Sequence, residues 1–513
     1  MSQMLSISST YFGERVAWTA TNEMRLDLLL HCLKLDASFH KDHTSGELLE
    51  RIDGDVNTLS NFFSRFVIVF IGNVLLILGV ISLLMIEDWR MGIGISLLAL
   101  ISLSIMVKAR VIAIPYWKKV RQINADFVGF LSEKLSGAED LLANGAYGFV
   151  MNRFDRIMQQ WYPMRRKAMV ATNLLRSTNI IMSALGTMVA FALGGYLWER
   201  EAITIGTVYL VFHYTAMIRY PLSQLRNQIE DLQKAEASIQ RIQELFETNP
   251  KLVDGQQNEL PAGPLSPAFV GVTFGYEGTG NDHEVALHEV NFSLASGRVL
   301  GLLGRTGSGK TTIAKLLMRL YDPNSGEVRL GDINIKQLSM KALRNQVGMV
   351  TQDVQLFQAT IRDNLTLFNP TITDDQIYSA VNDLGLESWL LAKPNGLDFR
   401  LKAGGKNLSA GQAQLLAFAR AFLSNPGLVI LDEASSRLDP ATEWLTERAV
   451  DKLLHNRTGI IIAHRLGTVQ RADDIMILED GSVLEYGNRI QLSQDSNSRF
   501  CNLLETGLEG VLD

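Results

Sequence analysis

Four stretches in the first half of the chain carry no charged residue over lengths close to that of a membrane span. They cover residues 66–86, 91–107, 177–198 and 202–218. A spanning helix needs about 20 predominantly apolar residues. The stretches form two pairs, and only a few polar residues join the members of each pair. This pairing predicts two transmembrane hairpins rather than buried helices of a soluble protein.

Basic residues predict the orientation of these spans. The segment between the hairpins, residues 108–176, contains twelve Lys and Arg against five Asp and Glu. Basic loops stay on the cytoplasmic side, so an even number of spans places both ends of the chain there as well. Within the spans, Asn73 and His213 are polar groups in apolar surroundings. They are candidates for hydrogen bonds between helices or for a transport path.

A linker separates the spans from a second domain. Residues 219–247 keep helical spacing and are expected to extend the last span into the cytoplasm. The stretch that follows, ETNPKLVDGQQNELPAGPLSP, contains four prolines and two glycines, which is typical of a linker. We therefore predict a membrane domain over residues 1–247, a linker over 248–265 and a second domain over 266–513.

Composition agrees with a membrane protein and excludes some other classes. The chain is 47% hydrophobic and 20% charged, with a mean hydropathy of +0.09. A net charge of −6 argues against a nucleic-acid partner, because such proteins usually carry a basic face. Cys32 and Cys501 lie far apart and have neither metal-binding nor redox spacing.

The strongest chemical signal is a phosphate-binding loop near residue 304. Apolar residues 299–303 precede GRTGSGKT, and an amphipathic helical pattern follows. This context matches the motif G-x-x-x-x-G-K-[ST]. Backbone N–H groups would wrap the phosphates, Lys310 would contact the β and γ oxygens, and Thr311 would bind Mg²⁺. The predicted phosphate-binding residues are Gly304, Arg305, Thr306, Gly307, Ser308, Gly309, Lys310, Thr311 and Thr312.

A second motif supplies carboxylates. Apolar residues 428–431 predict a buried strand that ends at Asp432, and Glu433 follows directly. Asp432 can hold Mg²⁺ directly or through a water molecule. Glu433 can polarise the water that attacks the γ-phosphate. The Asp-Glu pair is a weak motif alone and becomes strong beside the phosphate-binding loop.

Three further positions complete the candidate site. The strand in GIIIAHRL would deliver His464 to the same sheet edge as Asp432, although a purely structural histidine is the alternative. The strand in GMVTQDVQLF is predicted to end at Gln352, whose amide can reach a metal or water. In VTFGY, Tyr276 can stack on a base, although core packing would be favoured for this residue alone.

The segment LSAGQ, residues 408–412, precedes the apolar run LLAFARAFL. Small side chains at a helix start leave the N–H groups of the first turn open to an anion, which the helix dipole also favours. A phosphate is the expected ligand. The five residues alone do not identify the molecule that carries it.

The ordered set of these motifs, with SRLD at residues 436–439, resembles the ATP-binding cassette over residues 266–513. The first 247 residues look like the membrane domain of an ABC exporter of the multidrug and lipid type. Residues 35–56 and 135–154 are similar to that family's two cytoplasmic loops, which carry coupling helices. The resemblance implies an α-helical transmembrane domain followed by an α/β P-loop NTPase domain with a helical subdomain.

The resemblance also implies a division of labour between two chains. The LSAGQ segment of one subunit would cap the nucleotide of the other, so Ser409, Gly411 and Gln412 join the predicted nucleotide ligands. ATP and Mg²⁺ are the implied cofactors, and the partner is a second half-transporter, in a homodimer or a heterodimer. The implied substrate is a hydrophobic or amphipathic small molecule, lipid or peptide. The resemblance implies that the chain is a multi-pass protein of the cell or inner membrane. The implied catalytic residues are Lys310, Asp432, Glu433, His464 and Gln352, and the implied metal ligands are Thr311, Gln352 and Asp432.

The sequence departs from the family pattern at several places. Ala410 stands where glycine is the commonest residue in the family, and Ala413 stands where a basic residue is usual. The segment LKAGG at residues 401–405 lacks an acidic residue that is often found there. Four spans are found where the family has six, so we expect that the first hairpin is truncated or supplied by a partner. The main alternative function is a truncated remnant that binds ATP without transport. A soluble ABC ATPase and an importer are disfavoured.

Overall fold

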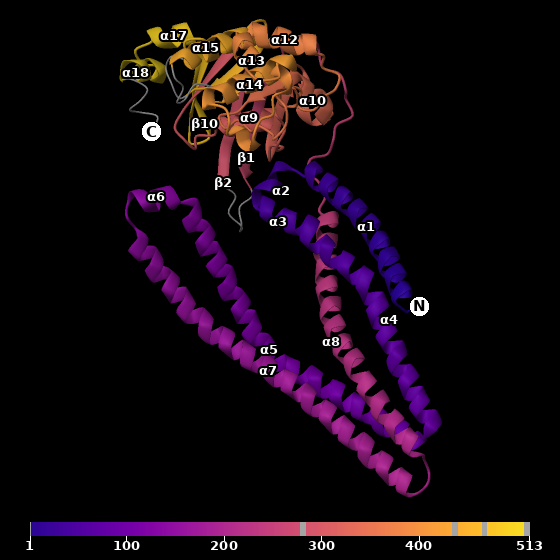
Figure 1. Ribbon diagram of the computed structural model, residues 1–513. Coiled ribbons are helices and arrows are strands. Elements are labelled where there is room, and N and C mark those ends of the chain that lie inside the picture. The colour runs from indigo at the N-terminus through magenta and orange to yellow at the C-terminus, as the bar shows by residue number, and fades with distance from the viewer. Residues whose placement is uncertain (1, 277–283, 433–439, 464–468, 507–513) are drawn as a thin grey trace. The chain divides into compact units, whose positions relative to one another are not determined.

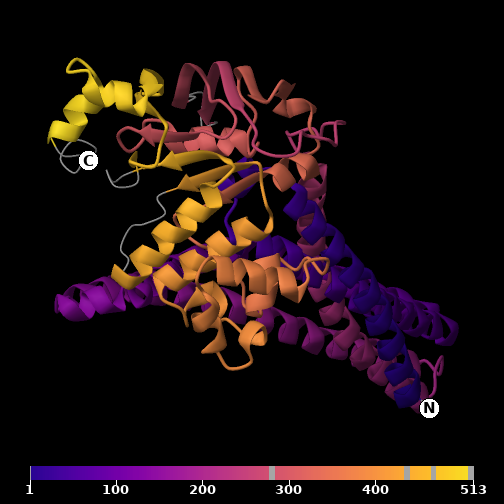
Figure 2. The same ribbon diagram turned by 90° about the horizontal axis from the view of Figure 1, so that it is seen from above.

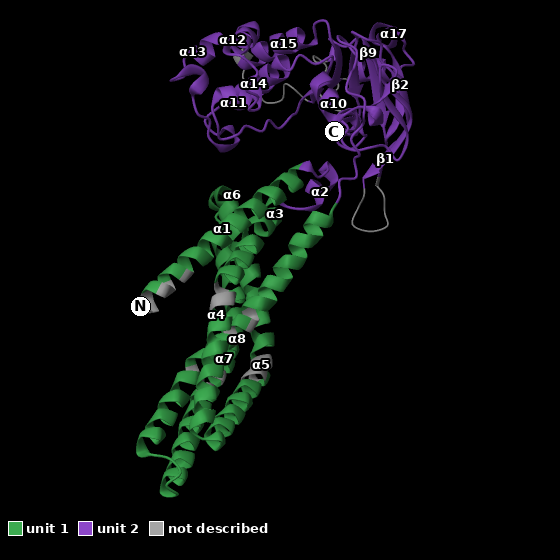
Figure 3. Ribbon diagram, turned by 90° about the vertical axis from the view of Figure 1, so that its right-hand side faces the viewer, with its two compact units in different colours: residues 1–33, 45–248 green, residues 34–44, 249–513 purple. Residues whose placement is uncertain are grey.

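The computed structural model describes the chain except residues 1, 277–283, 433–439, 464–468 and 507–513. It divides into two compact units, coloured separately in Figure 3. The helical unit comprises Met1–Leu33 and Ser45–Thr248, and the sheet unit comprises Lys34–Thr44 and Asn249–Asp513. The short segment Lys34–Thr44 therefore packs with the second half of the chain, although it lies in the first half of the sequence.

The helical unit is built from long helices. Helix α4 lies along α8, and α5 lies along α7; the two pairs converge at the end far from α6 (Figure 1). The short helix α6 lies within residues 135–154, which are similar to the second cytoplasmic loop of the family. The elements are α1 (Ser2–Lys34), α3 (Ser45–Leu49), the π-helix η1 (Glu50–Asp55), α4 (Val56–Glu87), α5 (Trp89–Ser136), α6 (Ala138–Ala143), α7 (Tyr147–Glu199) and α8 (Ile205–Glu247).

A buried apolar cluster holds these helices together where they converge. Outside it, many large apolar side chains are exposed, including Leu75, Leu100 and Ile180. Water does not favour such a surface, whereas lipid does. The buried members of the cluster are Val80, Leu84, Met91, Ile95, Ala190, Leu197, Val211 and Ile218.

The structure supports part of the predicted span pattern. Among the described residues, Ser45–Glu87 and Ile180–Glu199 are long and apolar enough to cross a membrane, while Trp89–Ile105 is apolar but shorter. The predicted fourth stretch begins too early, because residues 202–204 precede α8 and lie outside a helix. The number of spans stays a prediction.

The polar residues of the spans bond or pack within their own helices. Asn73 Nδ2 donates to the Val69 carbonyl at 2.7 Å. The ring of His213 lies 6.5 Å from those of Tyr209 and Tyr214, both on α8. The structure thus records no hydrogen bond between helices for Asn73 in the part of the chain that it describes.

An ion pair with a buried carboxylate joins the start of α4 to the C-terminal part of α8. Asp55 is only 2% exposed. Arg241 Nε donates to Asp55 Oδ2 at 2.8 Å, a second Arg241 nitrogen donates to Oδ1, and Ser238 Oγ donates to Oδ1 at 2.8 Å. The hydrogen bond to this carboxylate raises the pKa of Arg241. Nearby, Asp53 pairs with Arg25 at 3.1 Å, and its side chain is 57% exposed.

The sheet unit contains two sheets. An antiparallel sheet has the order β2-β1-β4-β5, and a six-stranded sheet has the order β10-β9-β3-β8-β7-β6. In the second sheet only the β9–β10 pair is antiparallel. The strands are β1 (Pro267–Tyr276), β2 (Glu284–Ser293), β3 (Val299–Leu303), β4 (Ser325–Leu330), β5 (Ile333–Asn334), β6 (Val347–Val350), β7 (Leu428–Asp432), β8 (Thr458–Ile462), β9 (Asp474–Glu479) and β10 (Ser482–Asn488).

Helices surround these sheets. Figure 2 shows the helices of residues 361–423, in orange, gathered to one side of the strands. The helices are α2 (Ala37–Asp42), α9 (Lys310–Leu317), α10 (Met340–Gln346), α11 (Ile361–Thr366), α12 (Asp374–Asp383), α13 (Glu387–Leu391), α14 (Ala410–Leu423), α15 (Pro440–Leu454), α17 (Arg489–Gln494) and α18 (Arg499–Thr506), with 3₁₀ turns η2 (Ile335–Gln337), η3 (Gly396–Asp398) and η4 (Ala403–Gly405).

The six-stranded sheet is buried on both faces. In β7, Leu428 and Ile430 pack into a cluster with α9 and the antiparallel sheet. Val429 and Leu431 point the other way, into a cluster with α14 and its neighbours. Alternate side chains on a strand point to opposite faces, so this strand reads as a continuous apolar run. The predicted fold class, a helical region followed by an α/β domain with a helical subdomain, is confirmed.

We predict that Asp55→Asn lowers the stability of the helical unit more than Asp53→Asn. Removing the charge of a buried, multiply bonded carboxylate costs about 2 kcal/mol, whereas an exposed pair contributes less than about 1 kcal/mol. Thermal unfolding of the two variants in the same lipid nanodiscs measures the difference. Equal shifts would show that burial of Asp55 adds nothing to its ion pair.

Candidate nucleotide-binding site

The strand register brings the ends of three strands to one sheet edge. Leu302 of β3 pairs with Ile462 of β8, and Asp432 of β7 pairs with the same residue. The loop that follows β3 and the carboxylate of Asp432 therefore share this edge, as parallel pairing requires. Glu433 and His464 follow β7 and β8 in the sequence, but both lie outside the described residues.

The loop after β3 depends on glycine at three positions. Gly304, Gly307 and Gly309 have φ angles of 148°, 87° and 103°, a region that glycine adopts without steric cost. A Cβ on Gly304 would lie 2.3 Å from the Leu478 carbonyl oxygen. Arg305 and Thr306, by contrast, are exposed at the outside of the loop.

The inside of the loop fits an anion. Lys310 is buried, and its Nζ donates to the carbonyls of Gly304 at 2.6 Å and Arg305 at 2.8 Å. Ser308 Oγ is buried and has no hydrogen-bond partner among the described residues. A buried hydroxyl without a partner is costly, and a phosphate oxygen would satisfy it. Together with the N–H groups at the start of α9, these groups fit the phosphates of ATP.

The two threonines after Lys310 differ in their surroundings. Thr311 is exposed at the start of α9, so its hydroxyl is available to a metal ion. Thr312 is 5% exposed, and its Oγ1 lies 3.2 Å from the Tyr276 hydroxyl. The side chain of Thr312 therefore contacts Tyr276, and its role as a phosphate ligand stays a prediction.

Tyr276 lies in an aromatic and cationic cluster at the end of β1. Its ring packs edge-to-face against Phe274 at 5.0 Å and Tyr321 at 5.4 Å. Lys41 Nζ lies 4.7 Å and Lys315 Nζ 5.4 Å from the ring centroid, distances that give cation–π attraction. Sequence analysis did not identify these lysines, because no local pattern connects residues 41 and 276.

A cavity of about 140 Å³ opens beside this cluster, with Lys41, Tyr276 and Tyr321 in its wall. Burial, followed by the neighbouring Tyr276 and Asp42, raises the pKa of Tyr321. Tyr321 is therefore neutral at physiological pH. The cavity shows that a half-buried Tyr276 still borders open space, where a base can approach.

The remaining predicted residues lie on two other segments. Gln352 is exposed and stands two residues after β6, which ends at Val350 rather than at Gln352 as predicted. Ser409 caps α14: its Oγ accepts the Gln412 N–H at 3.2 Å, and Gln412 Oε1 accepts the Ser409 N–H at 3.3 Å. Gly411 is buried in the first turn. The S-x-x-Q spacing is the sequence signal for this capping box.

Comparison with known proteins identifies the family. Residues 1–222 match the ABC transporter transmembrane region, and residues 287–436 match the ABC transporter family. The uncharacterized ABC transporter ATP-binding protein YknV of Bacillus subtilis is 34% identical over 473 residues, which cover 92% of this chain and 77% of the relative. An ATP-dependent lipid A-core flippase of Colwellia psychrerythraea is 31% identical over 498 residues, covering 93% and 81%. The chain therefore belongs to the ABC transporter family.

A solved structure shares the fold. A bacterial Atm1-family ABC exporter with ATP bound superposes with a TM-score of 0.79 at 24% identity, over 96% of this chain and 86% of that one. The chain is an exporter-type half-transporter of the membrane, and it couples ATP hydrolysis to export. Half-transporters of this family work as dimers within the membrane. The comparisons give no support to the alternative of a non-transporting remnant.

We predict that Gly309→Ala damages the phosphate-binding loop more than Gly307→Ala. Both positions have positive φ, so both variants carry similar backbone strain. Only at Gly309 does the new Cβ meet other atoms, Leu287 Cδ2 at 2.6 Å and the Ala286 carbonyl oxygen at 2.8 Å. Overpacking of this kind costs about 1–3 kcal/mol. Thermal unfolding and binding of a fluorescent ATP analogue measure the two effects, and equal losses would contradict the steric argument.

Proposed function

We propose that two copies of this chain form the transporter, with each ATP held between the phosphate-binding loop of one copy and the LSAGQ segment of the other. The buried Ser308 hydroxyl, which has no hydrogen-bond partner among the described residues, is the observation that carries the proposal, because a phosphate oxygen would satisfy it beside Lys310. A homodimer suffices, since one chain contains every motif. The exposed, Ser409-capped start of α14 is the surface offered to the second nucleotide.

Within this site we assign roles to the charged and polar residues. Lys310 would leave the loop carbonyls and bind the β- and γ-phosphates, and Tyr276 would stack on the base beside its two lysines. Thr311, Gln352 and Asp432 would hold Mg²⁺, which when bound neutralises charge on the phosphates. Glu433 would orient the attacking water, and His464 would contact the γ-phosphate.

We further propose the orientation and the class of cargo. The chain would be a multi-pass protein of the cell or inner membrane, with the nucleotide-binding domain, residues 266–513, in the cytoplasm. The membrane domain would cover residues 1–247 and the linker 248–265. The cargo would be an amphipathic molecule, a class that agrees with the lipid flippase among the relatives and with the exposed apolar surface of the helices.

We predict that Ser409→Asp retains the fold but loses the ATP-bound dimer. Aspartate caps a helix as well as serine does, so α14 keeps its start and the melting temperature stays close to that of the wild type. The added carboxylate would repel the γ-phosphate of the other copy. ATP hydrolysis and ATP-induced dimerisation should fall at least tenfold, whereas Ser409→Asn, the neutral control, should fall less. Full activity of the aspartate variant would remove Ser409 from the nucleotide interface.

We predict that Glu433→Gln binds ATP, hydrolyses almost none and traps a nucleotide-sandwiched dimer. The amide retains the size of the side chain but cannot polarise water as a carboxylate does. Hydrolysis of ATP, size-exclusion mass and nucleotide retention measure the three effects, with Lys310→Ala as the control that should lose binding itself. Wild-type turnover in Glu433→Gln, or hydrolysis per molecule that stays constant under dilution to monomers, would overturn the proposed mechanism.

A further inference from the structure

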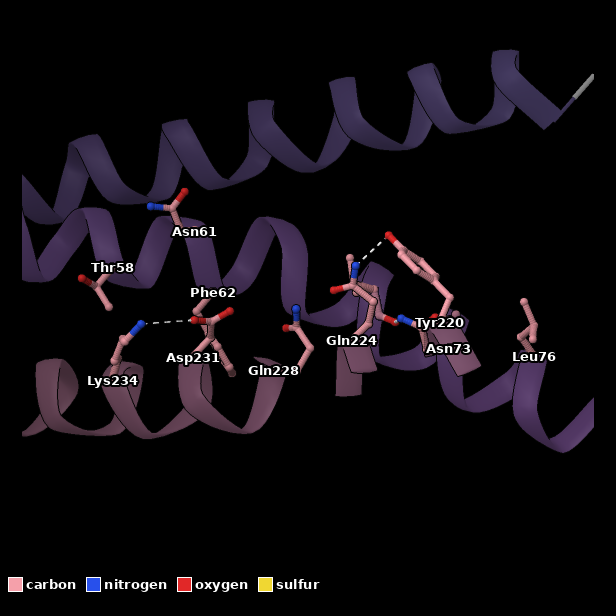
Figure 4. A pocket seen from close by; sticks show the side chains of 12 residues that line it. Thr58, Asn61, Phe62, Asn73, Leu76, Tyr220, Gln224, Gln228, Asp231 and Lys234 are labelled. Atoms are coloured by element: carbon pink, nitrogen blue, oxygen red, sulfur yellow. Dashed lines mark hydrogen bonds and ion pairs between the residues drawn. The ribbon is translucent and has the colours of Figure 1, made fainter. Parts of the chain in front are cut away.

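A large pocket lies between α4 and α8 in the helical unit (Figure 4). Its volume is about 800 Å³, within the range of small-molecule sites. Residues 58–76 of α4 form one wall and residues 220–234 of α8 form the other. None of the nucleotide-site residues named above is among its described lining residues.

Carboxamide side chains dominate the polar lining. Gln228 is 7% exposed and lines the pocket. Asn73 and Gln224 each use their nitrogen, to the Val69 carbonyl at 2.7 Å and the Tyr220 hydroxyl at 2.6 Å. Figure 4 shows Gln228, Gln224 and Asn73 along the space between the two helices, and Asn61 also belongs to the lining. A carboxamide both donates and accepts hydrogen bonds, and a buried one requires partners.

The described lining has little charge to offer a ligand. Lys234 Nζ lies 3.6 Å from Asp231 Oδ1 on the same helix (Figure 4). This pair is half-exposed and cancels its own charge. To bind a buried ionic head group, the pocket would need an unpaired side chain of opposite charge. The described lining therefore matches a neutral head group better than an anion or a cation.

The pocket also has a direction. Asn61 lies before the charge-free stretch of residues 66–86, and Asp231 lies beyond the last one, whereas Val69 and Leu76 lie within the first. One end therefore lies next to the charged extensions of the helices, and the other combines the apolar Val69 and Leu76 with the amide of Asn73. An amphipathic molecule matches both ends at once.

We propose that this pocket binds the uncharged, hydrogen-bonding head group of an amphipathic substrate, a sugar or an amide, with its apolar chain directed toward Val69 and Leu76. The inference rests on the proposed export function, and it adds the chemical class of the substrate. Gln228 is the specificity-determining residue, because it lines the pocket and its amide can both donate and accept hydrogen bonds.

Two glycines of α4 provide a matched test. A Cβ on Gly72, which lines the pocket, would meet no atom within 4 Å, and the same holds for Gly79 two turns away, which is not in the lining. Leucine is favoured over glycine in a helix at both positions. Gly72→Leu fills the pocket, and Gly79→Leu adds the same bulk on the same helix outside it.

Binding is measured directly, without ATP, on the full chain in phosphatidylcholine nanodiscs. The probe is a fluorescent short-chain glucosyl diacylglycerol, with the corresponding phosphatidylglycerol and trimethylammonium lipids as charged competitors. We expect the glucosyl probe to bind, both competitors to displace it at least tenfold less well than unlabelled glucosyl lipid, and Gly72→Leu and Gln228→Leu to weaken it at least tenfold. Gly79→Leu should bind as the wild type does.

Other results overturn the inference. Stronger displacement by a charged lipid would show that the pocket selects charge, and an unchanged affinity in Gly72→Leu would place the probe elsewhere. If Gln228→Leu misfolds, the comparison of Gly72→Leu with Gly79→Leu still tests the proposal independently. Because binding is measured without nucleotide, its failure is distinct from a failure of ATP hydrolysis, which the Glu433→Gln experiment reports.

Discussion

The parallel pairing of β3, β7 and β8 is the constraint on which the nucleotide site depends. It places the end of β3 and Asp432 on either side of the end of β8, so the phosphate-binding loop and a carboxylate share one sheet edge although their sequence positions are far apart. Burial of the sheet on both faces makes this register costly to change, because a slip by one residue would exchange the two faces of each strand. The loop itself then needs only local chemistry: glycines with positive φ, one buried lysine and one buried hydroxyl.

That division explains which parts of the site could be predicted from the sequence. The loop around Lys310 is contiguous, and its strand-loop-helix context is visible in the hydrophobic pattern. The pairing of Asp432 with this loop followed from the rule that parallel strands end at one edge. The cations beside Tyr276 could not be predicted, because Lys41 reaches the ring only through the packing of α2 within the sheet unit. The capping role of Ser409 was not predicted, although its spacing to Gln412 is the signal for a capping box.

In the helical unit, hydropathy identified segments but not their partners. It located the apolar stretches, yet it placed the start of α8 three residues too early because Ala202 and Ile203 are apolar residues in a turn. For Asn73 it left open a bond between helices or a place in a transport path, and the structure shows the amide nitrogen bonded within α4. The ion pair of Asp55 with Arg241 joins residues on distant segments, and single-sequence periodicity contains no information about such contacts.

The contacts between α4 and α8 show how their polar pocket can coexist with a stable pair of helices. At one end the Asp55–Arg241 ion pair joins the start of α4 to α8. At the other end Val80 and Ile218 belong to the buried apolar cluster. Between these two ends the helices are separated by the pocket. A change in the width of the pocket therefore requires α4 or α8 to bend within this stretch. Gly72 in α4 and Pro221 in α8 lie there, and these residue types weaken a helix by adding backbone freedom and by removing a backbone hydrogen bond. The helices are thus joined at both ends and most compliant beside the pocket.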